Sequence, residues 1–247
     1  MDTKAKEAFL DRYLTPIAVL IGAGIIAAAL AFGQGGAGNV AQQPGQQPPA
    51  QPVDIKDVKT DTGPYVGEKN APVVMAVWFD YQCPYCKQLE LTTMPQVYEQ
   101  YVKTGKVRIV FKDFQFLDEY SKTDHKTDSM DAALFARAVW EAHPDRFYDW
   151  YIAMAEKQDD EFAGFGDRAS IEALTRTIPG IDADRVLALL KDKTPEYTEA
   201  IVADRTEGTS LGINGTPAII IGTTLLSGAQ PIDKVAPLID ALLAKKK

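Results

Sequence analysis

Cysteine is scarce in this chain of 247 residues, which contains only Cys83 and Cys86. A scaffold held together by several disulfides is therefore excluded, and so is a four-cysteine zinc site. Histidine is equally scarce, because His125 and His143 are the only two and lie too far apart for a short-range ligand pair. We expect no bound metal and no cofactor.

Basic residues are fewer than acidic ones, with 26 Lys and Arg against 34 Asp and Glu, so the net charge is −8. An acidic chain repels phosphate, and we therefore expect no nucleic acid as a partner. Hydrophobic residues make up 46% and charged residues 24% of the chain, close to the averages of globular proteins. Wholesale disorder is thus excluded as well.

Charged residues are absent from Leu14 to Val53. The first part of that stretch, Leu14 to Phe32, is almost entirely apolar or small, and as a helix it would span about 28 Å at ~1.5 Å per residue. This length matches a bilayer core of ~30 Å. Three basic residues precede the stretch and the next one is Lys56, a bias that places residues 1–13 in the cytoplasm and the rest of the chain outside. The prediction is a single-pass cell-membrane protein that contacts the lipid bilayer through residues 14–32.

A cleaved signal peptide is the alternative for this segment, because Ala29-Leu30-Ala31 could serve as a cleavage site. Signal peptides usually have apolar cores of ~7–15 residues, shorter than this one, so the pattern favours an uncleaved signal anchor. After the anchor, Gln, Gly and Pro fill 15 of the 20 positions from Gly33 to Pro52. Such a composition buries too little apolar surface to offset chain entropy, and we assign residues 33–62 to a flexible linker.

The rest of the chain has the element pattern of an α/β protein. Val73–Phe79 is a continuous apolar run, typical of a strand buried on both faces. A helix is expected from Pro84 to near Gly105, then a strand at Val107–Phe111 and, after a helical region, a hairpin of Ala218–Ile221 with Thr224–Leu226. Further helices are predicted at Ser129–His143, Asp145–Lys157, Ala169–Thr177, Asp182–Lys191, Glu196–Leu211 and, by the spacing of its apolar residues, around Val235–Leu243.

The motif Cys83-Pro84-Tyr85-Cys86 stands between the buried strand and the helix that follows it. Pro84 suits the first helical position, which needs no N–H group. Cys83 then lies at or beside the N-cap, where unpaired N–H groups and the helix dipole favour a thiolate. Cys86 follows on the same helical face and can attack a mixed disulfide at Cys83. We expect an exposed, activated Cys83 and a resolving Cys86.

Two other interpretations of the motif are weaker. Half of a zinc site would need two more ligands, which the two distant histidines do not readily supply. A purely structural disulfide would close too short a loop to constrain the unfolded chain much. The position between strand and helix therefore favours redox chemistry.

A second motif, Gly215-Thr216-Pro217, comes just before the strand Ala218–Ile221. Proline at the start of a strand removes a backbone donor, so it is expected to have another use there. Taken together, the segment from Asp80 to Cys86 and the Gly-Thr-Pro motif about 130 residues later resemble the DsbA-like branch of the thioredoxin superfamily. The resemblance covers about residues 60–245.

This resemblance implies a thioredoxin core of residues 63–117 and 206–247 with a helical insertion at 118–205. It also implies a cis bond between Thr216 and Pro217, which would lie against the reactive disulfide. The Thr216 backbone would pair with an extended substrate chain, and Pro217 would keep metal from binding across the thiols. The partners implied are client proteins with cysteines outside the cytoplasm and a quinone-linked membrane protein for re-oxidation.

The sequence departs from the family at one position and differs from its strongly oxidising members at another. Members often carry a buried acid six residues before the first cysteine, where this chain has Val77; Asp80 either replaces that acid or is a solvated loop residue. Strongly oxidising members have a histidine at the position of Tyr85, which with Pro84 is expected to tune the redox potential. We therefore predict a potential between those of DsbA and thioredoxin.

The function predicted is that of an extracytoplasmic thiol–disulfide oxidoreductase that donates disulfides to client proteins. A reductase or isomerase on the same fold remains open, as does a non-catalytic module such as a metal carrier or assembly factor. Trp78 and Phe79 are expected in the core rather than in contact with substrate, and His125 in a solvated loop.

Overall fold

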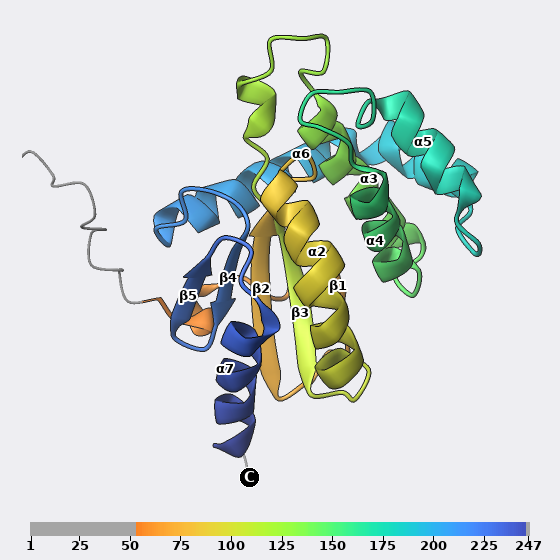
Figure 1. Cartoon of the computed structure of the whole chain (residues 1–247). Helices are drawn as coiled ribbons and strands as arrows, with labels where there is room; N and C mark the ends of the chain where they lie inside the picture. The colour runs from red at the N-terminus through yellow and green to blue at the C-terminus, as the bar shows by residue number, and fades with distance from the viewer. Residues whose placement is uncertain (1–52, 246–247) are drawn as a thin grey trace, which may run out of the picture. The chain divides into compact units, whose positions relative to one another are not determined.

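The computed structural model describes residues 53–245 (Figure 1). Its strands and helices follow the order expected from the sequence. They are η1 (Ile55–Asp57), β1 (Tyr65–Val66), β2 (Val73–Phe79), α2 (Pro84–Val97), η2 (Tyr98–Val102), β3 (Val107–Asp113), η3 (Leu117–Glu119), α3 (Asp128–Ala142), α4 (Phe147–Lys157), α5 (Arg168–Thr177), α6 (Ala183–Ser210), β4 (Ala218–Ile221), β5 (Thr224–Ser227) and α7 (Ile232–Ala244). A short edge strand, β1, and two brief helical turns, η1 and η3, are present in addition, and the helix expected from Pro84 to near Gly105 is α2 continued by η2.

The strands form one mixed sheet in the order β1-β3-β2-β4-β5. β2 runs parallel to β3, with Val73 opposite Val107, and antiparallel to β4, with Val77 opposite Ile219. β2 is thus the central strand, and its side chains are almost all buried, which explains why its sequence is a continuous apolar run rather than an alternating one.

Helices pack on both faces of the sheet. α2 and α7 lie together on the face seen in Figure 1, where Met75 and Val77 of β2 point into the larger core cluster. On the other face Trp78 is buried against α6, and its indole Nε1 donates to the carbonyl of Asp204 at 3.1 Å. A side chain at Gly208 would clash there, since a Cβ would lie 2.7 Å from that Nε1 atom. Trp78 and Phe79 are core residues, as expected.

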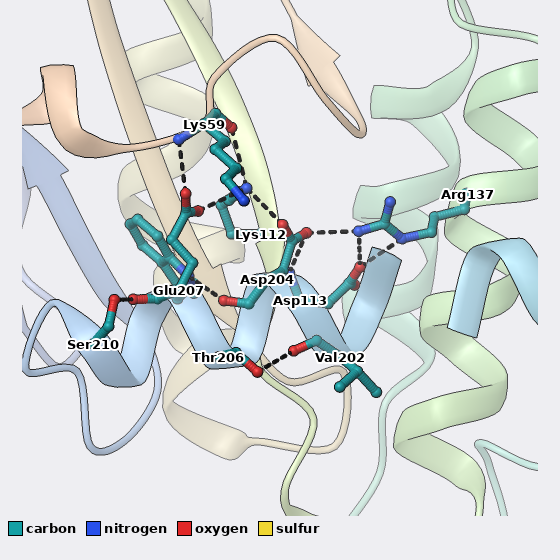
Figure 2. Close-up of polar contacts among 10 residues, drawn as sticks. Lys59, Lys112, Asp113, Arg137, Val202, Asp204, Thr206, Glu207 and Ser210 are labelled. Carbon is teal, nitrogen blue, oxygen red and sulfur yellow. Dashed lines mark hydrogen bonds and ion pairs between the residues drawn. The ribbon is translucent and has the colours of Figure 1, made fainter. Parts of the chain in front are cut away.

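A buried network of charges ties β3 to the helical region (Figure 2). The Nζ atom of Lys112 lies 2.5 Å from Asp204 and 2.9 Å from Glu207, both on α6. Arg137, on α3, bonds Asp204 at 2.6 Å and Asp113 of β3 at 2.7 Å. Every charged group of this cluster has an opposite charge beside it, which is the condition for burying it.

Two predictions about helices and linker need correction. The two helices expected at 182–191 and 196–211 are a single helix, α6, which continues through Pro195 and past the predicted end of the insertion at residue 205. The apolar side chains that α6 buries lie on both sides of that proline, so packing against one core holds the helix together. The predicted linker is also too long, because Val53 and Val58 are buried and η1 lies between them.

Within residues 53–245 no helix is both long and apolar enough to cross a membrane. The predicted membrane span, residues 14–32, and the linker up to residue 52 lie outside the described residues.

Candidate active site

The cysteine motif lies where the sequence places it, at the junction of β2 and α2. Cys83 is the N-cap of α2 with an extended backbone, φ −78° and ψ 121°, and Pro84 is the first residue of the helix. The N–H of Cys83 donates to the carbonyl of Asp80 at 3.1 Å, closing the turn that leads out of the strand. This turn fixes the Cys83 side chain at the positive end of the helix dipole.

The Cys83 thiol is acidic. Its pKa falls from the usual 9.0 to about 7, because the Cys86 thiol donates to the thiolate, an effect that outweighs burial, which raises the pKa. The Thr216 side chain and the backbone N–H groups of Tyr85 and Cys86 lower it further. Near neutral pH a large fraction of Cys83 is therefore the nucleophilic thiolate.

The second motif meets the first at this point. The bond between Thr216 and Pro217 is cis, and the carbonyl oxygen of Thr216 lies 3.5 Å from the Cys83 sulfur. The structure thus brings Cys83 and Thr216 together from segments 133 residues apart.

One expectation about Cys83 is wrong, because its side chain is only 5% exposed rather than open to solvent. The carbonyl oxygen of Thr216, 3.5 Å from the Cys83 sulfur, is one of the atoms that lie against it. Tyr85, between the two cysteines, is 63% exposed and is the part of the motif that faces solvent.

Cys86 differs chemically from Cys83. It is 1% exposed, and burial raises its pKa well above 9.0, with the neighbouring Cys83 and the charge of Glu90 adding to the rise. Cys86 therefore holds its proton at neutral pH, and a step that uses it as a nucleophile or leaving group needs a place for that proton.

Asp80 is not the solvated loop residue that the sequence allowed. It is buried, and its two carboxylate oxygens accept four hydrogen bonds. The donors are the N–H groups of Gln82, Phe116 and Leu117 and the hydroxyl of Ser129, at 2.6 to 3.1 Å. Asp80 thus ties the turn before Cys83 to the segment after β3 and to the start of α3.

The model of the thioredoxin family described as "Thioredoxin" matches residues 59–241, about three quarters of the chain. The chain belongs to this family. Disulfide bond formation protein D of Bacillus subtilis is 24% identical over 183 residues, which are 74% of this chain and 78% of that protein. A probable disulfide bond formation protein D of Bacillus anthracis is 26% identical over 183 residues.

Solved structures show the same relationship. The thiol–disulfide exchange protein α-DsbA2 of Wolbachia pipientis is 27% identical, with a TM-score of 0.61, and the match covers 73% of this chain and 87% of that one. BdbD of Bacillus subtilis has the same fold, with a TM-score of 0.63, 24% identity and coverage of 79% and 97%. The family match and these relatives together identify the chain as a DsbA-like thiol–disulfide oxidoreductase.

Glu90 is a residue near the cysteines that the sequence reasoning missed. It lies on α2, is 2% exposed, and burial raises its pKa from 4.5 to about 8 against the lowering effect of the Tyr151 hydroxyl. The signal was present in the sequence, since Glu90 follows Cys86 by four residues and therefore shares its helical face.

His125 lies in a polar segment, as expected, but it is not simply solvated. Its Nδ1 atom is 2.8 Å from a carboxylate oxygen of Asp128, at the start of α3. The imidazole is thus paired with a carboxylate of the helical region.

Proposed function

We propose that this oxidoreductase donates disulfides to client proteins through Cys83 and Cys86. The observation that carries the proposal is the contact between the acidic Cys83 thiol, at the N-terminus of α2, and the backbone of Thr216. A client thiolate attacks the sulfur of Cys83 in the oxidised enzyme and Cys86 leaves. A second client thiolate then releases the client as a disulfide, with Cys83 as the thiolate leaving group, a role that its low pKa favours.

The client binds as an extended chain along Thr216 and Pro217. This segment leads directly into β4 and lies against Cys83, so a client strand that pairs with the Thr216 backbone has its own cysteine beside the reactive sulfur. Main-chain hydrogen bonds do not depend on which side chains the client carries, so this mode of binding would accept clients of different sequence.

The domain works outside the cytoplasm, held at the cell membrane by the predicted anchor at residues 14–32. Two features support this proposal: the bias of basic residues across the apolar segment, and the likeness to a periplasmic thioredoxin-like protein of Salmonella enterica, 25% identical with a TM-score of 0.56. Stable client disulfides also need an oxidising compartment. A membrane redox partner then re-oxidises the cysteine pair.

Trapping of mixed disulfides tests the assigned roles. The Cys86→Ala variant should accumulate client proteins bound through Cys83, because the resolving thiol is missing. Cys83→Ala should trap far fewer, since Cys86 is buried and protonated. The trapped species are counted by non-reducing electrophoresis, and equal trapping by the two variants would contradict the roles.

The direction of electron flow is tested by the redox potential. The Cys83 pKa of about 7 is close to the ~7 of thioredoxin and far above the ~3.5 of DsbA. We therefore expect a potential between ~−120 mV, that of DsbA, and ~−270 mV, that of thioredoxin. Equilibration with glutathione measures it. A value at or below that of thioredoxin would favour the alternative function, a reductase or isomerase on the same fold.

A further inference from the structure

The buried thiol of Cys86 must lose or gain a proton in every reaction cycle, yet it lies away from solvent. Glu90 lies one helical turn further along α2, and side chains at this spacing have Cβ atoms about 5–6 Å apart. Both side chains are buried in the same region, and the charge of Glu90 acts directly on Cys86.

One carboxylate oxygen of Glu90 is free to bind a proton. Its Oε1 atom is buried and has no hydrogen-bond partner among the described residues. The charged and titratable groups facing Glu90 are Cys83 and Cys86 on its own helix, Asp80 and Tyr81 from the turn before it, and Tyr148 and Tyr151 from α4. None of them is a cation. Only the Tyr151 hydroxyl favours the carboxylate form of Glu90, and burial outweighs it.

Asp80 is the other buried acid near the cysteines, but its oxygens are already occupied. Three backbone N–H groups and the Ser129 hydroxyl donate to it. The Asp80 carboxylate therefore holds the surrounding segments together through four hydrogen bonds, and protonating it would break some of those bonds. Val77, six residues before Cys83, is apolar and has no proton to exchange.

We propose that Glu90 carries the proton to and from the sulfur of Cys86, directly or through one water molecule. This inference rests on the proposed exchange at Cys83 and Cys86, and it is independent of which direction prevails in the cell.

Oxidation of a client takes two exchange steps. A client thiolate forms a bond to the Cys83 sulfur, the bond between Cys83 and Cys86 breaks, and the protonated Glu90 gives its proton to the departing Cys86 thiolate. The second client thiolate then attacks the client sulfur of the mixed disulfide and Cys83 leaves as a thiolate. The client loses two electrons and the cysteine pair gains them.

In the reverse direction Glu90 is the base. When a mixed disulfide stands on Cys83, the ionised Glu90 takes the proton of Cys86 as its sulfur attacks Cys83. Burial raises the pKa of the Cys86 thiol well above 9.0. The pKa of Glu90, raised to about 8, makes Glu90 a stronger base toward that thiol than an ordinary carboxylate with a pKa of 4.5.

The test separates the two chemical steps. The reduced, full-length enzyme is mixed with glutathione disulfide, quenched with acid, and the mixed disulfide and the intramolecular disulfide are counted by mass spectrometry. In the unmodified enzyme, formation of the mixed disulfide should follow the Cys83 pKa of about 7, and its resolution should rise with pH to a plateau near pH 8, where Glu90 ionises.

The Glu90→Gln variant keeps the shape of the side chain and removes the proton. Its first step should be nearly unchanged, while resolution should slow roughly 100-fold or more, the usual contribution of a general base. Its resolution rate should keep rising above pH 9 without a plateau, because Cys86 must then ionise alone. Glu99→Gln, at an exposed acid, removes the same charge and should leave both steps unchanged.

Two results would overturn the inference. One is a Glu90→Gln variant that resolves at the original rate with the original pH profile. The other is a loss of the plateau in Asp80→Asn but not in Glu90→Gln, which would assign the proton to Asp80. If Glu90→Gln does not fold, Glu90→Asp replaces it in the test. The shorter side chain moves the carboxylate away from Cys86, so the resolution rate should keep its plateau near pH 8 but be lower. A resolution rate equal to that of the unmodified enzyme would refute the inference. Failure to form any mixed disulfide would instead refute the proposed function.

Discussion

The pKa values of two cysteines three residues apart shift in opposite directions, because the N-cap of a helix and the buried first turn are different environments for a thiol. Cys83, at the N-cap, meets the N–H groups of the first turn and the Cys86 thiol, and its pKa falls to about 7. Cys86 is inside the helix and the core, where burial raises its pKa. The same four residues thus hold one thiol with a lowered pKa and one with a raised pKa, as the proposed roles of attacking thiolate and protonated partner require.

The residue at position 85 should set how oxidising the pair is. In Tyr85→His, the imidazolium adds a positive charge near the Cys83 thiolate, where an opposite charge lowers a thiol pKa by roughly 1–3 units. We expect a lower Cys83 pKa and a more oxidising potential, measured by the absorbance of the thiolate and by equilibration with glutathione. Tyr85→Phe, which adds no charge, is the control and should leave both nearly unchanged; a Tyr85→His variant with the original potential would contradict this.

Glu90 should make the stability of the reduced protein depend on pH. Because burial raises its folded pKa from 4.5 to about 8, the folded state binds the proton more tightly than the unfolded state does. The contribution to stability is therefore present below about pH 4.5 and is lost as the pH rises to about 8, a loss on the order of a few kcal/mol. In Glu90→Gln the stability measured by urea unfolding should fall less between about pH 4.5 and 8 than in the unmodified protein, while other buried acids such as Asp113 still contribute.

The control for this prediction is Glu99→Gln, because Glu99 is exposed. It should leave the pH dependence as it is in the unmodified protein. A Glu90→Gln variant with the same pH dependence as the unmodified protein would show that Glu90 titrates normally.

At the scale of elements, α6 is joined to the sheet by the buried charges of Figure 2. Arg137 of α3 forms ion pairs with both Asp113 and Asp204. Burial raises the pKa of Asp113 to about 6, against the charge and the hydrogen bonds of Arg137, which lower it. Removing the guanidinium leaves the buried Asp113 carboxylate without its ion-pair partner, while Asp204 keeps Lys112.

The Arg137→Ala variant should therefore lose roughly 3–5 kcal/mol of unfolding free energy, as expected for one broken buried pair. Urea unfolding followed by circular dichroism measures the loss. Arg176→Ala is the matched control, because Arg176 forms its ion pairs at the surface and its loss should change stability little. Equal effects of the two variants would show that the buried network adds no stability beyond a surface pair.

Local patterns were enough to predict β2, the start of α2 and the position of the two cysteines at their junction, because a buried strand and a helix N-terminus are specified by adjacent residues. The continuity of α6 through Pro195 was not predictable in this way, since it depends on a core built from distant segments. Asp204 likewise has no local signal of its partners, which lie on β3 and α3. Burial of Asp80 depends on donors 36 to 49 residues away.

For the whole molecule, the proposed anchor and linker determine which proteins the active site can reach. If the roughly 20 Gln-, Gly- and Pro-rich residues form the linker that the sequence predicts, its mean end-to-end distance would be roughly 25 Å, because a flexible chain spans ~5–6 Å times the square root of its residue number. The catalytic domain would then work close to the membrane surface, near both newly exported clients and a membrane redox partner.

Protease protection tests this arrangement. If the anchor orients the chain as its basic residues predict, protease added to cells with a permeable outer layer should degrade an epitope tag at the C-terminus and spare one at the N-terminus. Replacing Lys4, Lys6 and Arg12 by glutamate removes the bias that sets this orientation and should reduce the fraction of chains cleaved. Detergent lysis, which exposes both tags, is the control. A C-terminal tag that stays protected in intact cells would place the domain in the cytoplasm and refute the proposed role in client oxidation outside it.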